Sequence, residues 1–174
     1  MNAYVKLAKD AVEAYLKTGK ITPLPDNLPK IFLTSRAGVF VSIYNGEDLR
    51  GCIGAYLPTE PNLAEEIIQN SISAAANDYR FQPITEKEIP YLSYSVYILS
   101  EPKKINNLSE LDPKKYGILI KSETGKSGLL LPNLEGINTI EEQLSAVCSK
   151  CGVNLSKEKI TILKFSATKY DSNN

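Results

Sequence analysis

The sequence has 174 residues, of which 43% are hydrophobic and 23% are charged, and its 20 Lys and Arg are balanced by 20 Asp and Glu. It contains no His, which excludes Ser-His-Asp and Cys-His nucleophile pairs and His-ligated metal sites within this chain. The zero net charge provides no basic stripe for a phosphate backbone, so we expect no nucleic-acid binding.

The length is close to that of one globular domain, at ~150 residues per domain, so residues 1–174 are predicted to form a single domain. Residues 1–16 lack the apolar run and cleavage site of a signal peptide, and no apolar stretch approaches the ~18 residues of a membrane span. We therefore expect a soluble cytoplasmic protein with no membrane partner. In that reducing compartment the three Cys need not pair.

The first predicted elements are a helix and an extended connector. Apolar residues recur at helical spacing over residues 3–18, and Gly19 follows as a stop signal. The segment 22–29 is rich in Pro, which cannot continue a helix, so it is predicted to be extended.

A hairpin is predicted next, because residues 39–44 and 49–53 flank the turn pair Asn45 and Gly46. A two-residue loop would place apolar residues of the first strand beside polar residues of the second. A three-residue loop containing Gly46 would instead join the apolar residues of both strands on one face, and we prefer it. That apolar face would hold Val39, Val41, Ile43, Leu49, Gly51 and Ile53.

The opposite face of the hairpin would carry a thiol beside a guanidinium. Strand geometry places the Cα atoms of Arg50 and Cys52 about 6.5 to 7 Å apart, close enough for the charge to influence the thiol. Gly51 and Gly54 would leave the backbone bare around that thiol. The alternative is that Cys52 is simply buried packing.

Hairpins and helices continue without regular strand-helix alternation, which favours an α+β fold of antiparallel sheets flanked by helices. The further predicted elements are a helix opened by Pro61 and Asn62 that ends near Asn77, a strand over 91–99, a hairpin of 118–121 with 129–131, a helix from Thr139 to about Cys151, and a strand over 160–165.

Charged side chains follow the second helix directly. Asp78 and Arg80 lie in the loop where that helix ends, a usual place for binding groups on a rigid scaffold. Arg80 is one of three Arg, with Arg36 and Arg50, in a chain whose other basic residues are Lys. The planar guanidinium suits bidentate binding of carboxylate or phosphate, and structural ion pairs are the equally weighted alternative.

Two further motifs are interpreted as structural. The Gly125-Lys126-Ser127 segment lacks the first Gly of a phosphate-binding loop and is followed by a strand, so it is predicted to be a hairpin turn. Cys148 and Cys151 fall in the last turn of a helix, where the dipole disfavours a thiolate, so we interpret Cys148 as a buried hydrophobe. We expect no metal site and no cofactor.

Residues 49–54 read Leu-Arg-Gly-Cys-Ile-Gly, which resembles the signature hexapeptide of the AMMECR domain family. Bacterial and archaeal members are called AmmeMemoRadiSam system protein A. The likeness continues through residues 36–41, 78–83, 88–90 and 95–102, and covers essentially residues 3–170. One departure is Tyr79, where many bacterial members have Pro.

The resemblance implies a compact fold of two unequal lobes, with the hexapeptide near the cleft between them. It implies no established activity. Because members often accompany a Memo-type protein and a radical S-adenosylmethionine enzyme, it also implies a shared pathway with these two partners. The positions carried over by the resemblance are Arg50, Cys52, Asp78, Arg80 and Arg36.

The sequence does not decide whether the protein is an enzyme, and three hypotheses stay open. In the first, Arg50 and Arg80 clamp a small anionic ligand, Cys52 is a nucleophile, and Asp78 orients Arg80 or takes a proton. In the second, the same Arg-lined cleft belongs to a non-catalytic binding or scaffold module. In the third, the hexapeptide is a purely structural hairpin. The candidate ligand-binding residues are Arg36, Arg50, Gly51, Gly54 and Arg80.

Overall fold

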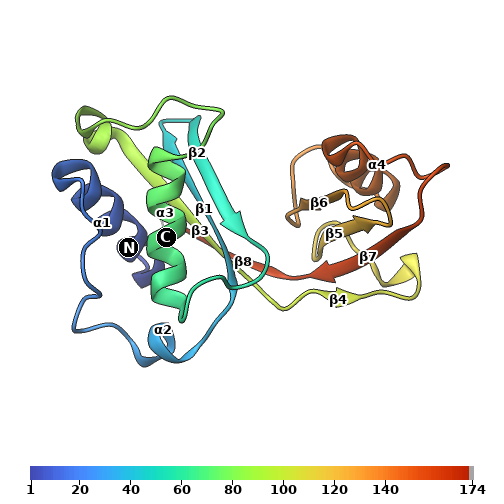
Figure 1. Ribbon diagram of the computed structural model, residues 1–174, viewed down its shortest axis with the longest axis horizontal. Coiled ribbons are helices and arrows are strands. Elements are labelled where there is room, and N and C mark those ends of the chain that lie inside the picture. Colours follow the sequence, from blue (N-terminus) through green and yellow to red (C-terminus); the bar gives the residue numbers. More distant parts are fainter. Residues whose placement is uncertain (173–174) are drawn as a thin grey trace. The chain divides into compact units, whose positions relative to one another are not determined.

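Helices and antiparallel strands are mixed along the chain, as a computed structural model shows for residues 1–172 (Figure 1). The mixture confirms the predicted α+β class of antiparallel sheets flanked by helices. The chain divides into two compact units, one formed by Met1–Leu99 with the segment from Thr168 onward, and the other by Ser100–Ala167. Each unit has one four-stranded sheet and its own hydrophobic cluster.

The sheet of the first unit has the strand order β2-β1-β3-β8, and helices α1 and α3 cover one of its faces (Figure 1). We call the covered face the inner face and the opposite one the outer face. The strands are β1 (Gly38–Asn45), β2 (Asp48–Ala55), β3 (Leu92–Leu99) and β8 (Ala167–Asp171). The helices are α1 (Ala3–Thr18), the short α2 (Lys30–Thr34), α3 (Leu63–Ala76) and the 3-10 helix η1 (Glu86–Tyr91).

The inner face forms the core of this unit. Alternate residues of β1 and β3 are fully or almost fully buried there, among them Val39, Val41 and Val96. They belong to one cluster with apolar residues of α1 and α3, such as Val12 and Ile67. Because side chains alternate across a strand, the intervening polar residues lie on the outer face.

Local capping explains where the long helices begin and end. The Asn2 side chain accepts the amide of Tyr4 at the start of α1, and Gly19 ends that helix in the left-handed conformation, with φ 69°. At the start of α3, the Asn62 side chain accepts the amide of Glu65. The predicted helix stop at Gly19 and helix start at Asn62 are confirmed.

The predicted apolar face of the hairpin is confirmed except at Leu49, which pairs with Tyr44, and the predicted three-residue loop is wrong. Val41 pairs with Ile53 and Ile43 with Gly51, as expected. Nearer the turn the register shifts by one residue between Ile43 and Tyr44, so that Asn45 pairs with Asp48 across a two-residue loop. A β-bulge therefore supplies the extra residue that we had assigned to the loop.

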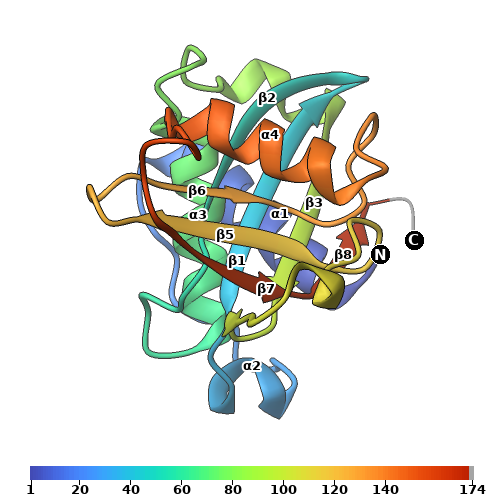
Figure 2. The same ribbon diagram turned by 90° about the vertical axis from the view of Figure 1, so that its right-hand side faces the viewer.

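The second unit has the strand order β4-β7-β5-β6, and helix α4 packs along β6 and β5 (Figure 2). Its core includes Ile118 and Ile120 of β5 and Val147 and Cys148 of α4. Thr139 and Glu142 form the predicted capping box at the start of α4. The elements are β4 (Lys103–Lys104), the 3-10 helix η2 (Leu108–Glu110), β5 (Gly117–Ser122), β6 (Ser127–Leu130), α4 (Ile140–Cys151) and β7 (Ile160–Phe165).

The two motifs that we interpreted as structural lie in the second unit, one in a hairpin turn and one at the end of α4. Gly125 has φ 86° in the turn between β5 and β6, and the Lys126 ammonium binds Glu158 and the carbonyl of Gly152. Cys148 is buried in the core, and that burial raises the pKa of its thiol. Over residues 1–172, no helix is long and apolar enough to cross a membrane.

Candidate functional site

The hexapeptide lies in β2, which is an edge strand of the first unit's sheet. An edge strand presents backbone groups that no neighbouring strand satisfies. At Cys52 these backbone groups are satisfied by two side chains from the loop after α3. The Cys52 amide donates to Asp78 Oδ2 at 2.8 Å, and Arg80 Nη2 donates to the Cys52 carbonyl at 3.1 Å. The Asp78–Arg80 pair thus stands in for a strand at the sheet edge.

The same two side chains form a bidentate ion pair. Arg80 Nε lies 2.9 Å from Asp78 Oδ1, and Nη2 lies 2.7 Å from Oδ2. The Asp78 side chain is 2% exposed and the Arg80 side chain 46% exposed. The hydrogen bond from Arg80 outweighs the effect of burial and, with the Cys52 amide, lowers the pKa of Asp78 to about 2. A carboxylate held in its charged form is a weak base, so the geometry favours orientation of Arg80 over proton transfer.

The Cys52 thiol points to the outer face, where it lies beside Ser42 of β1. The two residues are partners in the β1–β2 ladder, and the Ser42 hydroxyl donates to Sγ at 3.2 Å. Cys52 is a free thiol and is partly exposed. The alternative that Cys52 is simply buried packing does not describe this environment, because the thiol is partly exposed and its hydrogen-bond partner is polar.

The two glycines of the hexapeptide permit close backbone packing. A Cβ on Gly51 would lie 2.0 Å from the carbonyl oxygen of Ala74, so Gly51 allows α3 to approach β2. A Cβ on Gly54 would lie 2.3 Å from the carbonyl oxygen of Val39. We had expected Gly51 to leave the backbone bare around the thiol. Gly51 faces α3 instead, so it opens no space around the thiol, which lies on the other face.

The other two arginines make different contacts. Arg50 Nε donates to Glu88 at 2.8 Å and Nη2 donates to the Gln82 carbonyl at 3.3 Å, so this side chain ties β2 to the chain segment before β3. The hydrogen bond from Arg50 lowers the pKa of Glu88. Arg36 is exposed and donates to the carbonyl of Glu60. The guanidinium that contacts Cys52 is therefore that of Arg80, whereas we had expected Arg50.

Sequence reasoning missed a buried glutamate near the Arg36 contact. The Glu66 side chain is fully buried and accepts the amides of Thr59 and Glu60 at 2.7 and 2.8 Å. The Asn70 side chain donates to its other oxygen at 3.0 Å. Glu66 thus shapes the loop before α3. Its position among apolar helix residues was the signal available in the sequence.

A row of polar side chains crosses the outer face from β2 to β8. Ser42, which contacts Cys52, is the ladder partner of Ser95 in β3. Ser95 in turn donates to Asp171 of β8, which is ion-paired with Lys169 at 3.0 Å. Both serines are 4% exposed. The sequence contained a signal for this row, because polar residues alternate with apolar ones along β3.

The described residues, 1–172, contain no group of three or more Cys, Asp or Glu side chains placed to hold a metal ion. All the candidate site residues lie in the first unit. Asp78, Arg80 and Cys52 contact one another, while Arg50 and Arg36 bind other partners. The cleft between lobes stays a prediction from the resemblance.

Comparisons with known proteins match nearly the whole chain. The AMMECR1 family model matches residues 5–170. A Thermotoga maritima protein is 42% identical over 168 residues, which are 96% of this chain and 96% of that protein. Protein CA_C1420 of Clostridium acetobutylicum is 45% identical over 168 residues, and the chain spans only 35% of its length. The crystal structure of uncharacterized protein PH0010 from Pyrococcus horikoshii has a TM-score of 0.87 and 31% identity, with coverage of 97% of this chain and 89% of that one.

Proposed function

Because the chain belongs to the AMMECR1 family, whose matched relatives carry no activity in their names, we propose a function from its own side chains. The protein binds a small ligand that carries a carboxylate or phosphate group, and it does so beside Cys52. The observation that carries this proposal is a half-exposed guanidinium held in place by a buried carboxylate.

Arg80 has donors to spare for such a ligand. Within residues 1–172 its side-chain hydrogen bonds use Nε and Nη2, which bind Asp78 and the Cys52 carbonyl, and its side chain is 46% exposed. The Nη1 end is therefore available to a ligand oxygen. A guanidinium that is already fixed loses little conformational entropy on binding, which favours affinity. The Asp78 charge reduces the long-range attraction for an anion, so the proposal rests on directed hydrogen bonds rather than on net charge.

The remaining candidates take supporting roles in this proposal. Asp78 positions Arg80, and Arg50 positions β2 through Glu88. The Cys52 thiol borders the bound anion and serves as its neighbour or as a covalent acceptor. Within residues 1–172 the hydrogen bond to this thiol comes from the Ser42 hydroxyl, which is not a general base, whereas Asp78 and Arg80 bind the Cys52 backbone.

A second candidate function is a binding or scaffold module whose hexapeptide is purely structural. It is favoured by the way Asp78 and Arg80 satisfy the open edge of β2 at Cys52. The two functions differ in one respect, because only the first requires the exposed end of Arg80 to contact a ligand.

Thermal unfolding in phosphate or acetate, against chloride at matched ionic strength, tests the proposal. We expect phosphate or acetate to raise the melting temperature by roughly 2 to 4 °C per kcal/mol of linked binding free energy. The rise should be absent in Arg80→Ala and kept in Lys126→Ala, because the Lys126 side chain is likewise 44% exposed and paired with a carboxylate but lies in the second unit. A rise that survives in Arg80→Ala, or no rise with either anion, would leave the structural module as the better account.

We also propose, from the family resemblance, that the protein works in the cytoplasm with a Memo-type protein and a radical S-adenosylmethionine enzyme. Tyr79, which is 93% exposed next to Arg80, provides an aromatic contact of the kind that protein interfaces favour. Pull-down of purified partners against wild type and Tyr79→Ala tests this. If wild type and Tyr79→Ala capture the partners equally, Tyr79 is not part of the interface. If wild type captures neither partner, the proposed association is wrong.

A further inference from the structure

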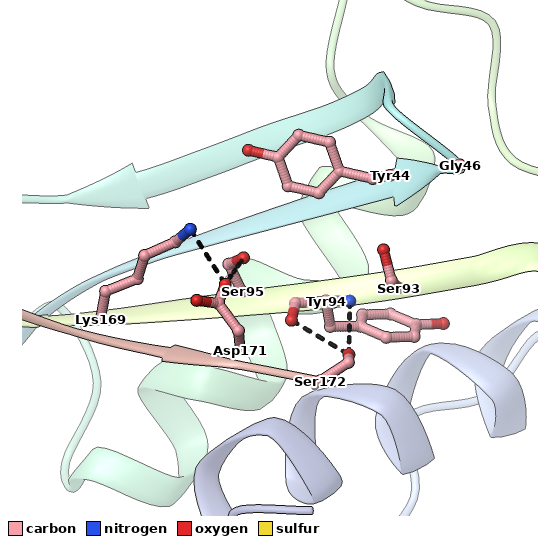
Figure 3. Close-up of a pocket in the computed structure, with 8 residues that line it drawn as sticks. All are labelled: Tyr44, Gly46, Ser93, Tyr94, Ser95, Lys169, Asp171 and Ser172. Carbon is pink, nitrogen blue, oxygen red and sulfur yellow. Dashed lines mark hydrogen bonds and ion pairs between the residues drawn. The ribbon is translucent and has the colours of Figure 1, made fainter. Parts of the chain in front are cut away.

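A pocket lies on the outer face of the first unit's sheet, and Cys52 is not part of its lining (Figure 3). Its volume is about 340 Å³, at the lower end of the range for small-molecule sites. Its walls come from the turn end of β1, from β3 and from β8. The side chains that the argument uses are Tyr44, Ser93, Ser95, Lys169 and Asp171.

The charged groups of this pocket balance one another. Lys169 and Asp171 form an ion pair at 3.0 Å, and their side chains are 47% and 33% exposed. Asp171 also accepts the hydroxyl of Ser95, which fixes its orientation (Figure 3). Because the pair has zero net charge, a charged ligand would meet repulsion from one member and attraction from the other. Both members keep hydrogen-bonding capacity, as an ammonium has three donors and a carboxylate about four acceptor sites.

The uncharged part of the lining adds hydroxyls and an aromatic ring. Tyr44 presents its ring and its phenol, and the Ser93 hydroxyl points away from the sheet (Figure 3). Within residues 1–172, neither hydroxyl has a recorded hydrogen-bond partner. Tyr94 contributes only backbone here, because its ring is buried in the core and its amide and carbonyl hold Ser172. The pocket therefore combines unengaged hydroxyls, a balanced ion pair and one aromatic face.

We propose that this pocket binds a small uncharged polyhydroxylated molecule of the size of a monosaccharide. Neighbouring hydroxyls of such a ligand both donate and accept, so one donates to Asp171 while the next accepts from Lys169. Tyr44 and Ser93 complete the hydrogen bonds at the opposite wall. The apolar C–H face of the ligand packs on the Tyr44 ring, whose phenol stays within reach of water. Neither Arg80 nor Asp78 lines this pocket, so the proposal does not depend on the anion site beside Cys52.

Amide NMR titration of the full chain tests this site with D-ribose, D-glucose and myo-inositol as probes. At about 50 mM each, a probe with a millimolar dissociation constant would fill most of the sites. We expect saturable shifts at the amides of Gly46, Ser93 and Lys169 with at least one probe. The absence of saturable shifts at these amides with all three probes would overturn the proposal. A larger saturable response to inorganic phosphate or to tetramethylammonium would overturn the ligand class.

Variants separate binding from folding. Tyr44→Ala and Asp171→Asn should each weaken binding of the responding probe by about tenfold, which corresponds to roughly 1.4 kcal/mol. Tyr44→Phe keeps the ring and should show a smaller loss. Lys126→Ala should bind the probe as the wild type does, because Lys126 lies in the second unit and outside the pocket. Unchanged affinity in both Tyr44→Ala and Asp171→Asn, with native amide spectra, would place the probe elsewhere and overturn the assignment.

Discussion

Two carboxylate-cation pairs, one in each unit, are similarly exposed but differ in their further hydrogen-bond partners. Asp78 with Arg80 ties a loop to β2, and Glu158 with Lys126 ties a loop to the turn between β5 and β6. In both pairs the carboxylate is at most 9% exposed, and the cation is 44% to 46% exposed. Exposure and ion pairing alone therefore do not identify a functional site.

The two pairs differ in the hydrogen-bonding capacity that stays available after their contacts within the protein. Glu158 accepts from the hydroxyls of Ser122 and Thr124 as well as from Lys126, whose ammonium also binds the Gly152 carbonyl. All these contacts serve to close a turn. Arg80, by contrast, binds Asp78 and the Cys52 carbonyl through Nε and Nη2 and, within residues 1–172, keeps Nη1 for a further acceptor. The second unit thus provides a structural reference against which the Cys52 site can be measured.

The largest expected effect comes from the glycines that let a helix approach each sheet. In Gly51→Ala the new Cβ would meet the backbone carbonyl of Ala74 at 2.0 Å, so α3 must move. In Gly128→Ala it would meet Cβ and Sγ of Cys151 at 2.9 Å and the Val147 carbonyl oxygen at 3.2 Å, so a smaller shift of α4 relieves the contact. We expect a loss of about 3 kcal/mol in the free energy of unfolding for Gly51→Ala and about 1 kcal/mol for Gly128→Ala.

Urea unfolding of both variants at neutral pH measures this difference. Equal losses would show that β2 and α3 tolerate separation as easily as β6 and α4 do. Since the substitution at Gly51 disturbs the strand that holds Cys52, a large loss there also links the integrity of the site to helix packing.

Acid unfolding gives the next effect, through the depressed pKa of Asp78. Its pKa of about 2 lies below the ordinary value near 3.8, so the folded state binds this proton less readily than the unfolded state. The resulting stability is fully present above the unfolded value and is lost as the pH falls toward about 2. Asp78→Asn should therefore cost about 2 kcal/mol at pH 7, and the difference from wild type should shrink across pH 4 to 2.

Glu158→Gln is the matched control for this prediction. Hydrogen bonds from Lys126, Ser122 and Thr124 lower the pKa of Glu158, so its contribution is also lost on acidification. Denaturant unfolding between about pH 2 and pH 7 compares the two variants. A constant offset between Asp78→Asn and wild type over this range would mean that Asp78 is not held in its charged form by the fold.

Most of the fold could be predicted because its elements carry strong local signals. The amphipathic pattern ending at Gly19, the Asn62 and Thr139 caps and the turn at Gly125 each specify a boundary through nearby residues. The elements that were missed are short, like α2 and β4, or gain their stability from distant strands, like β8. The bulge near Tyr44 was missed because a longer loop would also pair Val41 with Ile53 and Ile43 with Gly51, and only the position of Leu49 separates the two arrangements.

The sequence indicated candidate residues for the site but not which of them contact one another. The hexapeptide and the scarcity of Arg pointed to Arg50, Cys52 and Arg80. Which guanidinium contacts Cys52 depends on where the loop after α3 crosses the edge of β2, and no local pattern in the sequence encodes that crossing. For the same reason the Lys169–Asp171 pair was missed, since β8 follows β3 by almost 70 residues.

If Arg80 holds an anion beside Cys52, the bound anion should shield this thiol from alkylation. Mass spectrometry would follow iodoacetamide labelling of Cys52 with and without phosphate, with Cys151 in the same molecule as the internal reference. We expect phosphate to slow labelling of Cys52 in the wild type and in Lys126→Ala. In Arg80→Ala phosphate should not change the labelling rate of Cys52, and in all three proteins the labelling rate of Cys151 should stay the same. Equal Cys52 labelling rates with and without phosphate in the wild type would contradict it.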